Sequence, residues 1–149
     1  MAAYLEARAR SDVLLVGEAP GYRGARISGI PFMSERQVTG VGPAEATATI
    51  VRRVLHELGL EERVLCWNVV PTHPGTRTSN RRPSAAEIEA GAPFLEVLAR
   101  GRRTIAVGRL AEARLGAPAV RHPARGGAEA FRNGLIEWLG GRNSSADPA

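Results

Sequence analysis

Four side chains of this sequence have types that could do chemistry together: Glu18, Phe32, Asn68 and His122. A carboxylate can act as a base or stabilise a cationic intermediate. An imidazole can donate a hydrogen bond to a developing anion. An aromatic ring in a loop fixed by Pro31 can stack on a flat ligand, and an amide offers one acceptor and two donors to the edge of a pyrimidine. The set suits the release of a planar group that leaves with negative charge.

Each of these side chains also has a purely structural interpretation. Glu18 could cap N–H groups of its own loop, and Phe32 could fill part of the core. Asn68 could be a turn residue, and His122 could be a structural histidine before Pro123. The residue types alone leave both interpretations open.

The segment that contains Glu18 is rich in glycine and reads Gly17-Glu18-Ala19-Pro20-Gly21-Tyr22-Arg23-Gly24. A glycine-rich turn after a strand lets the backbone approach a ligand closely, and it can offer N–H groups to an anion. The glycine spacing matches neither the dinucleotide-binding fingerprint nor the Walker pattern. We expect no cofactor and no metal site.

Short apolar runs alternate with helical patterns along the chain. Continuous apolar runs of this length are typical of parallel strands that are buried on both faces. Strands are expected at Asp12–Gly17, Arg63–Trp67, Thr104–Gly108 and, briefly, Ala119–Arg121.

Helical spacing of apolar residues predicts helices over Pro43–Leu58, from Ser84 through Leu98, over Arg109–Leu115 and over Ala128–Leu139. The second of these opens with the capping box Ser84-Ala85-Ala86-Glu87. A single domain is expected over residues 1–139. The polar tail over residues 140–149 is expected to be disordered.

Strands separated by helices predict a three-layer α/β/α sandwich around a central, mainly parallel four-stranded sheet. Sheets of this kind bind ligands outside the carboxyl ends of their strands. The segments that follow those ends are Glu18–Thr39, Asn68–Pro83 and His122–Gly127. The four chemically interesting side chains all fall in these segments, so the sequence predicts a site at one edge of the sheet.

Composition sets limits on the class of protein. The chain has 149 residues, of which 44% are hydrophobic, and no stretch reaches the roughly 18 apolar residues of a membrane span. Met1–Arg10 carries Glu6 and lacks the continuous apolar core of a signal peptide. The lone Cys66 excludes a disulfide within one chain. We expect a cytoplasmic protein with no membrane partner, and a monomer.

The charge of the chain is unusual because every basic residue is an arginine. The 20 basic residues outnumber the 15 acidic ones and give a formal net charge of +5. Arginine in place of lysine could reflect a GC-rich genome alone. It could also mark a surface that contacts phosphates, because guanidinium groups bind phosphate through two hydrogen bonds. The net charge fits a polyanionic partner without naming one.

Four short motifs in order resemble the uracil-DNA glycosylase superfamily. They are Gly17-Glu18-Ala19-Pro20-Gly21, Gly29-Ile30-Pro31-Phe32, Asn68-Val69-Val70-Pro71 and His122-Pro123. The resemblance spans residues 13–135, and the first motif looks most like a bacterial and archaeal branch that carries an iron–sulfur cluster on four cysteines. With Cys66 alone, this chain cannot build that cluster.

The resemblance implies hydrolysis of the N-glycosidic bond of deoxyuridine, or another deaminated nucleotide, flipped out of DNA. By position, Phe32 would stack on the base and Asn68 would read its edge. His122 would stabilise the departing base, and Glu18 would orient water or stabilise the cationic sugar. The other expected substrate contacts are Ala19, Pro20, Gly21 and Tyr22.

DNA is the partner that the resemblance implies. The residues expected to contact it are Ser34, Arg77, Ser79, Arg81, Arg82, Arg121 and Arg125. Arg125 is the one expected to enter the duplex near the vacated base. Two departures from the family pattern stand out. The segment Tyr22–Arg26 lacks the acidic residues that usually follow the first motif, and Ala124 replaces a serine.

Two other functions fit the same residues. One is a nucleic-acid-binding protein that has kept the fold but lost turnover, which the altered Tyr22–Arg26 segment suggests. The other is a hydrolase of free nucleosides or nucleotides, which the short chain suggests.

Overall fold

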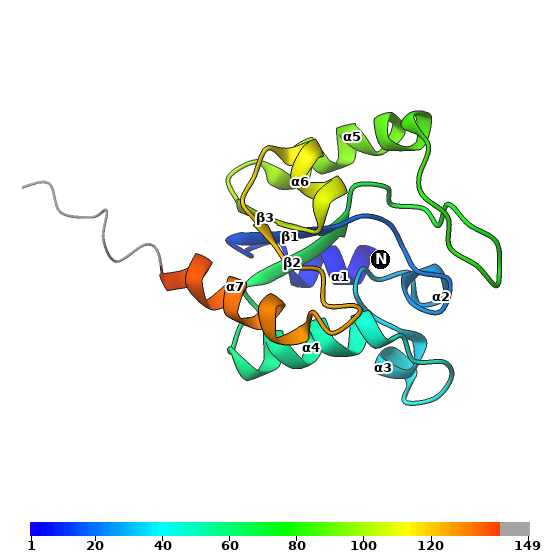
Figure 1. Ribbon diagram of the computed structural model, residues 1–149, viewed down its shortest axis with the longest axis horizontal. Helices are drawn as coiled ribbons and strands as arrows, with labels where there is room; N and C mark the ends of the chain where they lie inside the picture. Colours follow the sequence, from blue (N-terminus) through cyan, green and yellow to red (C-terminus); the bar gives the residue numbers. More distant parts are fainter. Residues whose placement is uncertain (141–149) are drawn as a thin grey trace, which may run out of the picture.

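A parallel sheet of four strands forms the centre of the structure, a computed structural model that describes residues 1–140. The strands are β1 (Val13–Gly17), β2 (Val64–Asn68), β3 (Arg103–Val107) and β4 (Ala119–Val120). Their order across the sheet is β2-β1-β3-β4, and every pairing is parallel (Figure 1). The carboxyl ends of all the strands therefore lie at one edge, as the sequence predicts.

Helices cover both faces of this sheet and complete the predicted three layers. The helices are α1 (Ala2–Ala7), α2 (Ala25–Ser28), α3 (Glu35–Thr39), α4 (Ala46–Glu57), α5 (Ala85–Ala99), α6 (Arg109–Leu115) and α7 (Ala128–Gly140). Helices α4 and α7 pack on one face, and α5 and α6 pack on the other (Figure 1). The predicted α/β/α architecture is confirmed.

Alternating side chains of the strands supply the two halves of the core. On β1, Val13 and Leu15 point toward α4 and α7, whereas Leu14 and Val16 point toward α5 and α6. All four are at most 1% exposed. Because both faces are covered, the strand shows no alternation of apolar and polar residues, which is why its sequence is a continuous apolar run.

The predicted helix boundaries agree closely with the structure, with one difference at α4. This helix begins at Ala46 rather than at Pro43, and Glu45 occupies the N-cap position. The capping box of α5 is present: the Glu87 backbone N–H donates to Ser84 Oγ at 3.3 Å, and Ser84 N donates to Glu87 Oε2 at 2.8 Å. These two bonds satisfy N–H groups that the first turn of a helix otherwise leaves free.

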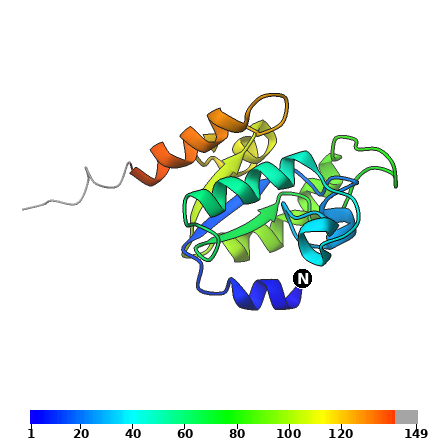
Figure 2. The same cartoon turned by 90° about the horizontal axis from the view of Figure 1, so that it is seen from below.

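Three short helices were not expected from the sequence. Helices α2 and α3 have only 4 and 5 residues, too few to produce a helical period. Helix α1 lies along the outer edge of β2 (Figure 2), where the Cys66 backbone N–H donates to the hydroxyl of Tyr4 at 2.8 Å. Burial raises the pKa of the Tyr4 hydroxyl well above its usual value. This contact anchors α1 to the sheet.

The expected tail, residues 140–149, overlaps the described part of the chain only at its first residue. Gly140 is the last residue of α7, and residues 141–149 lie outside the described part of the chain. Within residues 1–140, no helix has both the length and the apolar character required to cross a membrane.

The ring of Phe131 gives a direct test of the packing of α7 on the sheet. Phe131 is fully buried at 0% exposed and is the largest such side chain in the described residues. We expect Phe131→Ala to lower the free energy of unfolding in urea by about 3–5 kcal/mol, because it leaves a cavity in the core. The exposed Asn133, on the same helix, provides the control Asn133→Ala, expected within about 0.5 kcal/mol of wild type. A loss for Phe131→Ala no larger than that of the control would contradict this packing.

Candidate functional site

A large open cleft lies at the carboxyl ends of the strands and has a volume of about 1350 Å³. The cleft is lined by all four side chains singled out above, Glu18, Phe32, Asn68 and His122, which come from distant segments of the chain. Two backbone hydrogen bonds tie the segments after β1 and β2 together: Val69 N donates to Gly17 O at 2.9 Å, and Val70 N donates to Glu18 O at 3.0 Å. The structure therefore brings together the four side chains singled out in the sequence.

The amide of Asn68 and the ring of Phe32 lie side by side over Gly17. A Cβ atom on Gly17 would lie 2.5 Å from Phe32 Cζ and 2.7 Å from Asn68 Oδ1, closer than atoms can approach. Gly17 is also the register partner of Asn68 across the β1–β2 pair. Asn68 is only 4% exposed, and its amide makes no hydrogen bond to protein within residues 1–140. A nearly buried amide without a partner is available to a ligand.

Phe32 and Arg125 have an unusual backbone conformation. Their φ angles are +52° and +55°, and no other non-glycine residue of the described chain has a positive φ. A side chain in this left-handed region costs about 1–3 kcal/mol, and such residues cluster at binding and catalytic sites. Both residues line the cleft. This placement favours the functional interpretation of Phe32 over that of a core residue.

The Nδ1 atom of the His122 ring faces the backbone of its own loop. The backbone N–H of Ala124 donates to His122 Nδ1 at 3.2 Å, so Nδ1 acts as the acceptor. A neutral ring in this arrangement carries its proton on Nε2, which leaves Nε2–H as a donor. Burial lowers the pKa of His122, and the positive charge of the neighbouring Arg121 lowers it further. The imidazole is therefore neutral near pH 7 and has one N–H donor to offer.

Glu18 directly follows β1 and is half-buried in the cleft wall. Within residues 1–140, its carboxylate makes no hydrogen bond or ion pair. The alternative role of Glu18 as a cap for N–H groups of its own loop is therefore not what the structure shows. A carboxylate exposed to the cleft can stabilise a cation or bind a water molecule there.

Glu45 is a second carboxylate of the cleft, and it was not expected from the sequence. Its side chain lies against the glycines of the first motif: a Cβ on Gly24 would lie 1.6 Å from Glu45 Oε2, and one on Gly21 would lie 2.8 Å from Oε1. Burial raises the pKa of the Glu45 carboxyl above its usual value. The spacing of Gly21 and Gly24 was the available signal, but it does not identify the acid that approaches them.

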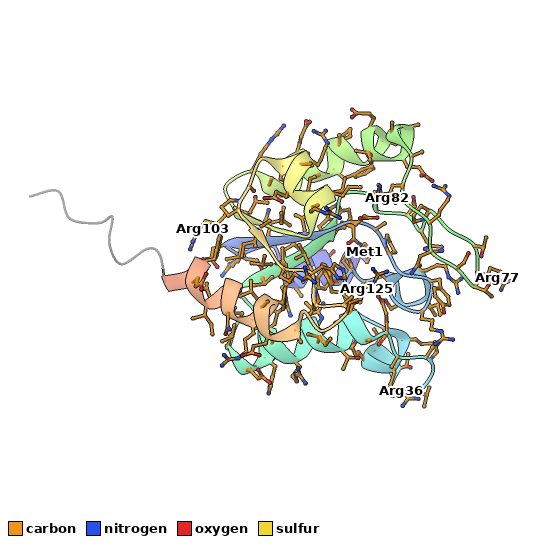
Figure 3. All side chains as sticks on the ribbon, viewed as in Figure 1. Met1, Arg36, Arg77, Arg82, Arg103 and Arg125 are labelled. Atoms are coloured by element: carbon orange, nitrogen blue, oxygen red, sulfur yellow. The ribbon has the colours of Figure 1, made fainter. Side chains whose placement is uncertain are left out.

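The expected backbone and arginine contacts divide into two groups. Ala19, Pro20, Gly21, Arg81, Arg82, Arg121 and Arg125 line the cleft, and so does Arg109, which was not expected. Arg77 and Ser79 lie in the loop after β2, outside the cleft walls, with Arg77 at its outer tip (Figure 3). Arg81 is held by Glu87 through two hydrogen bonds of 2.9 and 2.7 Å, which lower the pKa of the Glu87 carboxyl to about 2.

Two expectations need correction. Ser34 is 0% exposed, and its N–H and hydroxyl both donate to Gln37 Oε1 at 2.8 Å in the capping box of α3, so its side chain is not available to DNA. Tyr22 does not line the cleft. It borders an adjoining cavity of about 220 Å³, and the Arg23 guanidinium lies 5.3 Å from the centre of its ring.

Acidic, histidine and cysteine side chains do not gather into a metal site in the described part of the chain. Across residues 1–140, no three such groups lie close enough together to hold an ion. Cys66 is buried in β2, away from the cleft lining.

Comparisons with known proteins match the chain to a protein family and to a solved structure of similar fold. The family profile described as "Uracil DNA glycosylase superfamily" matches residues 5–139. Among solved structures, the crystal structure of wild-type SMUG2 from Pedobacter heparinus superposes with a TM-score of 0.68. The two chains are 17% identical, and the match covers 97% of this chain and 82% of that one. No curated protein matches in sequence.

Replacing the Glu45 carboxyl should stabilise the protein relative to wild type, and this difference should grow as the pH rises. Because the pKa of this carboxyl is raised in the folded state, ionising it costs stability. The cost is absent below the unfolded-state pKa, where both states are protonated, and it is complete above the folded-state pKa. We therefore expect the free energy of unfolding of Glu45→Gln to rise relative to wild type from pH 4 to pH 8 in urea titrations.

The exposed Glu89 on α5 provides the matched control for this measurement. Its Glu89→Gln variant should track the wild type across the same pH range. A Glu45→Gln difference that stays constant with pH, or that reverses in sign, would show that burial of the carboxylate is not costly.

Proposed function

The chain belongs to the uracil-DNA glycosylase superfamily, and from that premise we propose that it excises uracil or another deaminated base from DNA by hydrolysing the N-glycosidic bond. The observation that carries this proposal is the pairing of the free Asn68 amide with the ring of Phe32 in the cleft that also holds His122 and Glu18. The cleft exceeds the roughly 300–1,000 Å³ of most small-ligand pockets, which suits a nucleotide still joined to DNA.

Recognition of the base would depend on Phe32 and Asn68. A base flipped out of the duplex loses its stacking and pairing, at a cost of a few kcal/mol, and contacts in the pocket must offset that cost. The Phe32 ring offers a stacking surface, and the Asn68 amide offers an acceptor and donors to the edge of the base. Cytosine presents the reverse order of donor and acceptor to such an amide, so the amide favours uracil.

Bond cleavage would depend on His122 and Glu18. When the bond between the sugar C1′ and the base N1 breaks, its electron pair stays with the base, and the sugar becomes an oxocarbenium-like cation. The Nε2–H of His122 would donate to the oxygen on which the negative charge collects. The Glu18 carboxylate would stabilise the cation and orient the water that adds to C1′. The proton that this water loses balances the one that the released base anion takes up.

DNA binding would draw on the arginines at the cleft that have no carboxylate partner. Within residues 1–140, Arg82, Arg121 and Arg125 form no ion pair, whereas Arg81 is bound to Glu87. Figure 3 shows Arg82 and Arg125 on the side of the molecule away from Arg103, which lies at the other end of the sheet. Free guanidinium groups can bind phosphates through two hydrogen bonds. Arg125, within the His122–Gly127 segment, would occupy the space left by the flipped base.

Excision is tested with a uracil-containing oligonucleotide, treated with alkali after incubation to reveal abasic sites. We expect wild-type protein to cleave it and His122→Ala to react about 100- to 1,000-fold more slowly, because one donor to the leaving group is lost. Asn68→Ala should also be slower. The matched controls are His56→Ala and Asn133→Ala, which remove an exposed histidine and an exposed asparagine that do not line the cleft.

The same assay separates the two alternative functions. Wild-type protein no faster than the double variant His122→Ala, Asn68→Ala would contradict the glycosylase proposal. Salt-dependent binding of that DNA without base release would then favour a binding protein. Hydrolysis of free deoxyuridine without action on DNA would favour a hydrolase of nucleosides.

The pH dependence of excision should reveal the protonation state of His122. Protonation would place a hydrogen on Nδ1, facing the Ala124 N–H, and would break that contact. Because burial and Arg121 lower the pKa of His122 below its usual value of 6.5, the fall of the single-turnover rate toward acid pH should have its midpoint below pH 6.5. Arg121→Gln should move this acid limb to higher pH. A limb that does not move would mean that another group controls it.

A further inference from the structure

The side chain of Arg52 forms hydrogen bonds to the backbone of the loop that contains Phe32. Arg52 lies on α4, and its guanidinium donates from Nε to Phe32 O at 3.2 Å and from Nη2 to Pro31 O at 3.3 Å. Within residues 1–140, no other donor reaches either carbonyl. One planar group therefore binds two successive peptide carbonyls of the loop that carries the Phe32 ring.

Hydrogen bonds within the loop itself do not hold the backbone carbonyl of Phe32. Phe32 has the left-handed φ of +52°, a conformation that aromatic residues rarely adopt. The turns beside it close on themselves: Ser28 Oγ accepts from Ile30 N at 3.1 Å, and Met33 N donates to Ile30 O at 3.2 Å. The carbonyls of Pro31 and Phe32 take no part in these turns.

Arg52 lies on a helix whose inner face packs against the sheet. Its neighbours on α4, Val51 and Val54, are at most 1% exposed and pack against the sheet. The guanidinium lies close enough to Tyr4 and Cys66 to affect the pKa of both groups. A fork with two fixed N–H donors suits two adjacent carbonyls better than the single charged centre of a lysine.

We propose that Arg52 is a positioning residue that holds the Phe32 ring against Gly17 and Asn68, where it stacks on the flipped base. The inference rests on the proposed function, because stacking matters only if a base enters the cleft. Arg52 touches no reacting atom: it acts through the Phe32 backbone. Losing Arg52 should therefore have the same kinetic effect as losing the ring.

The test is a double-mutant cycle between Arg52→Met and Phe32→Leu, measured by single-turnover excision of uracil from DNA. Loss of stacking on one base is expected to slow excision about tenfold to a hundredfold in either single variant. The double variant should be no more than about twofold slower than Phe32→Leu alone, since neighbouring residues that act together are non-additive. Arg52→Lys, which keeps the charge without the fork, should fall between wild type and Arg52→Met.

The matched control is Arg53→Met on the next residue of α4. Arg53 is exposed and pairs only with Glu57, at 3.6 Å, within the described residues, so its loss should leave excision unchanged. A second measurement separates positioning from general damage. Arg52→Met should bind a duplex that carries a tetrahydrofuran abasic-site analogue as tightly as wild type, because that site offers no base to Phe32.

Each outcome decides one question. Losses that multiply in the double variant, or equally weakened binding of the abasic analogue, would overturn the role of Arg52 while leaving the glycosylase proposal intact. A wild-type protein that excises nothing would overturn the glycosylase proposal, and this inference with it. If Arg52→Met does not fold by circular dichroism, Arg52→Lys carries the same cycle and the same criteria.

Discussion

The close approach permitted at Gly17 is the constraint on which the candidate site depends. Parallel register places Gly17 beside Asn68 at the ends of β1 and β2, and the missing Cβ lets the Phe32 ring reach the Asn68 amide. Any larger residue at position 17 would separate these two groups. Phe32, with its left-handed φ, and the buried Asn68 meet at this contact. The site is thus set by backbone geometry before any ligand arrives.

The sheet explains how distant parts of the chain reach this contact. Its strands are parallel and buried on both faces, so the helices return the chain to the same starting edge each time. Every segment that leaves a strand therefore emerges at the cleft. His122 comes from the segment after β4, the shortest strand. Its Cβ and ring Cδ2 atoms lie 3.7 and 3.8 Å from the position that a Cβ would take on Gly108, directly after β3.

Much of this arrangement follows from the sequence, and the exceptions have physical causes. Apolar runs and the capping box at Ser84 predicted the sheet and its main helices, because these signals are local. Glu45, the N-cap residue of α4, and Arg52, on α4, were missed because they contact residues that are distant in the sequence, and nothing in their own neighbourhood marks them. Ser34 was misassigned because a hydroxyl that caps a helix and one that contacts a ligand look alike in sequence.

The hydrogen bond between Tyr4 and the Cys66 backbone also has a consequence for the edge of the sheet. An edge strand exposes unpaired N–H and C=O groups that can pair with a strand of another molecule. On β2, one of these N–H groups is already occupied by the Tyr4 hydroxyl, and α1 lies over that side. On the opposite edge, β4 has only 2 residues and offers little for a foreign strand to extend. Both edges of the sheet therefore leave few backbone groups for pairing with a strand of another molecule.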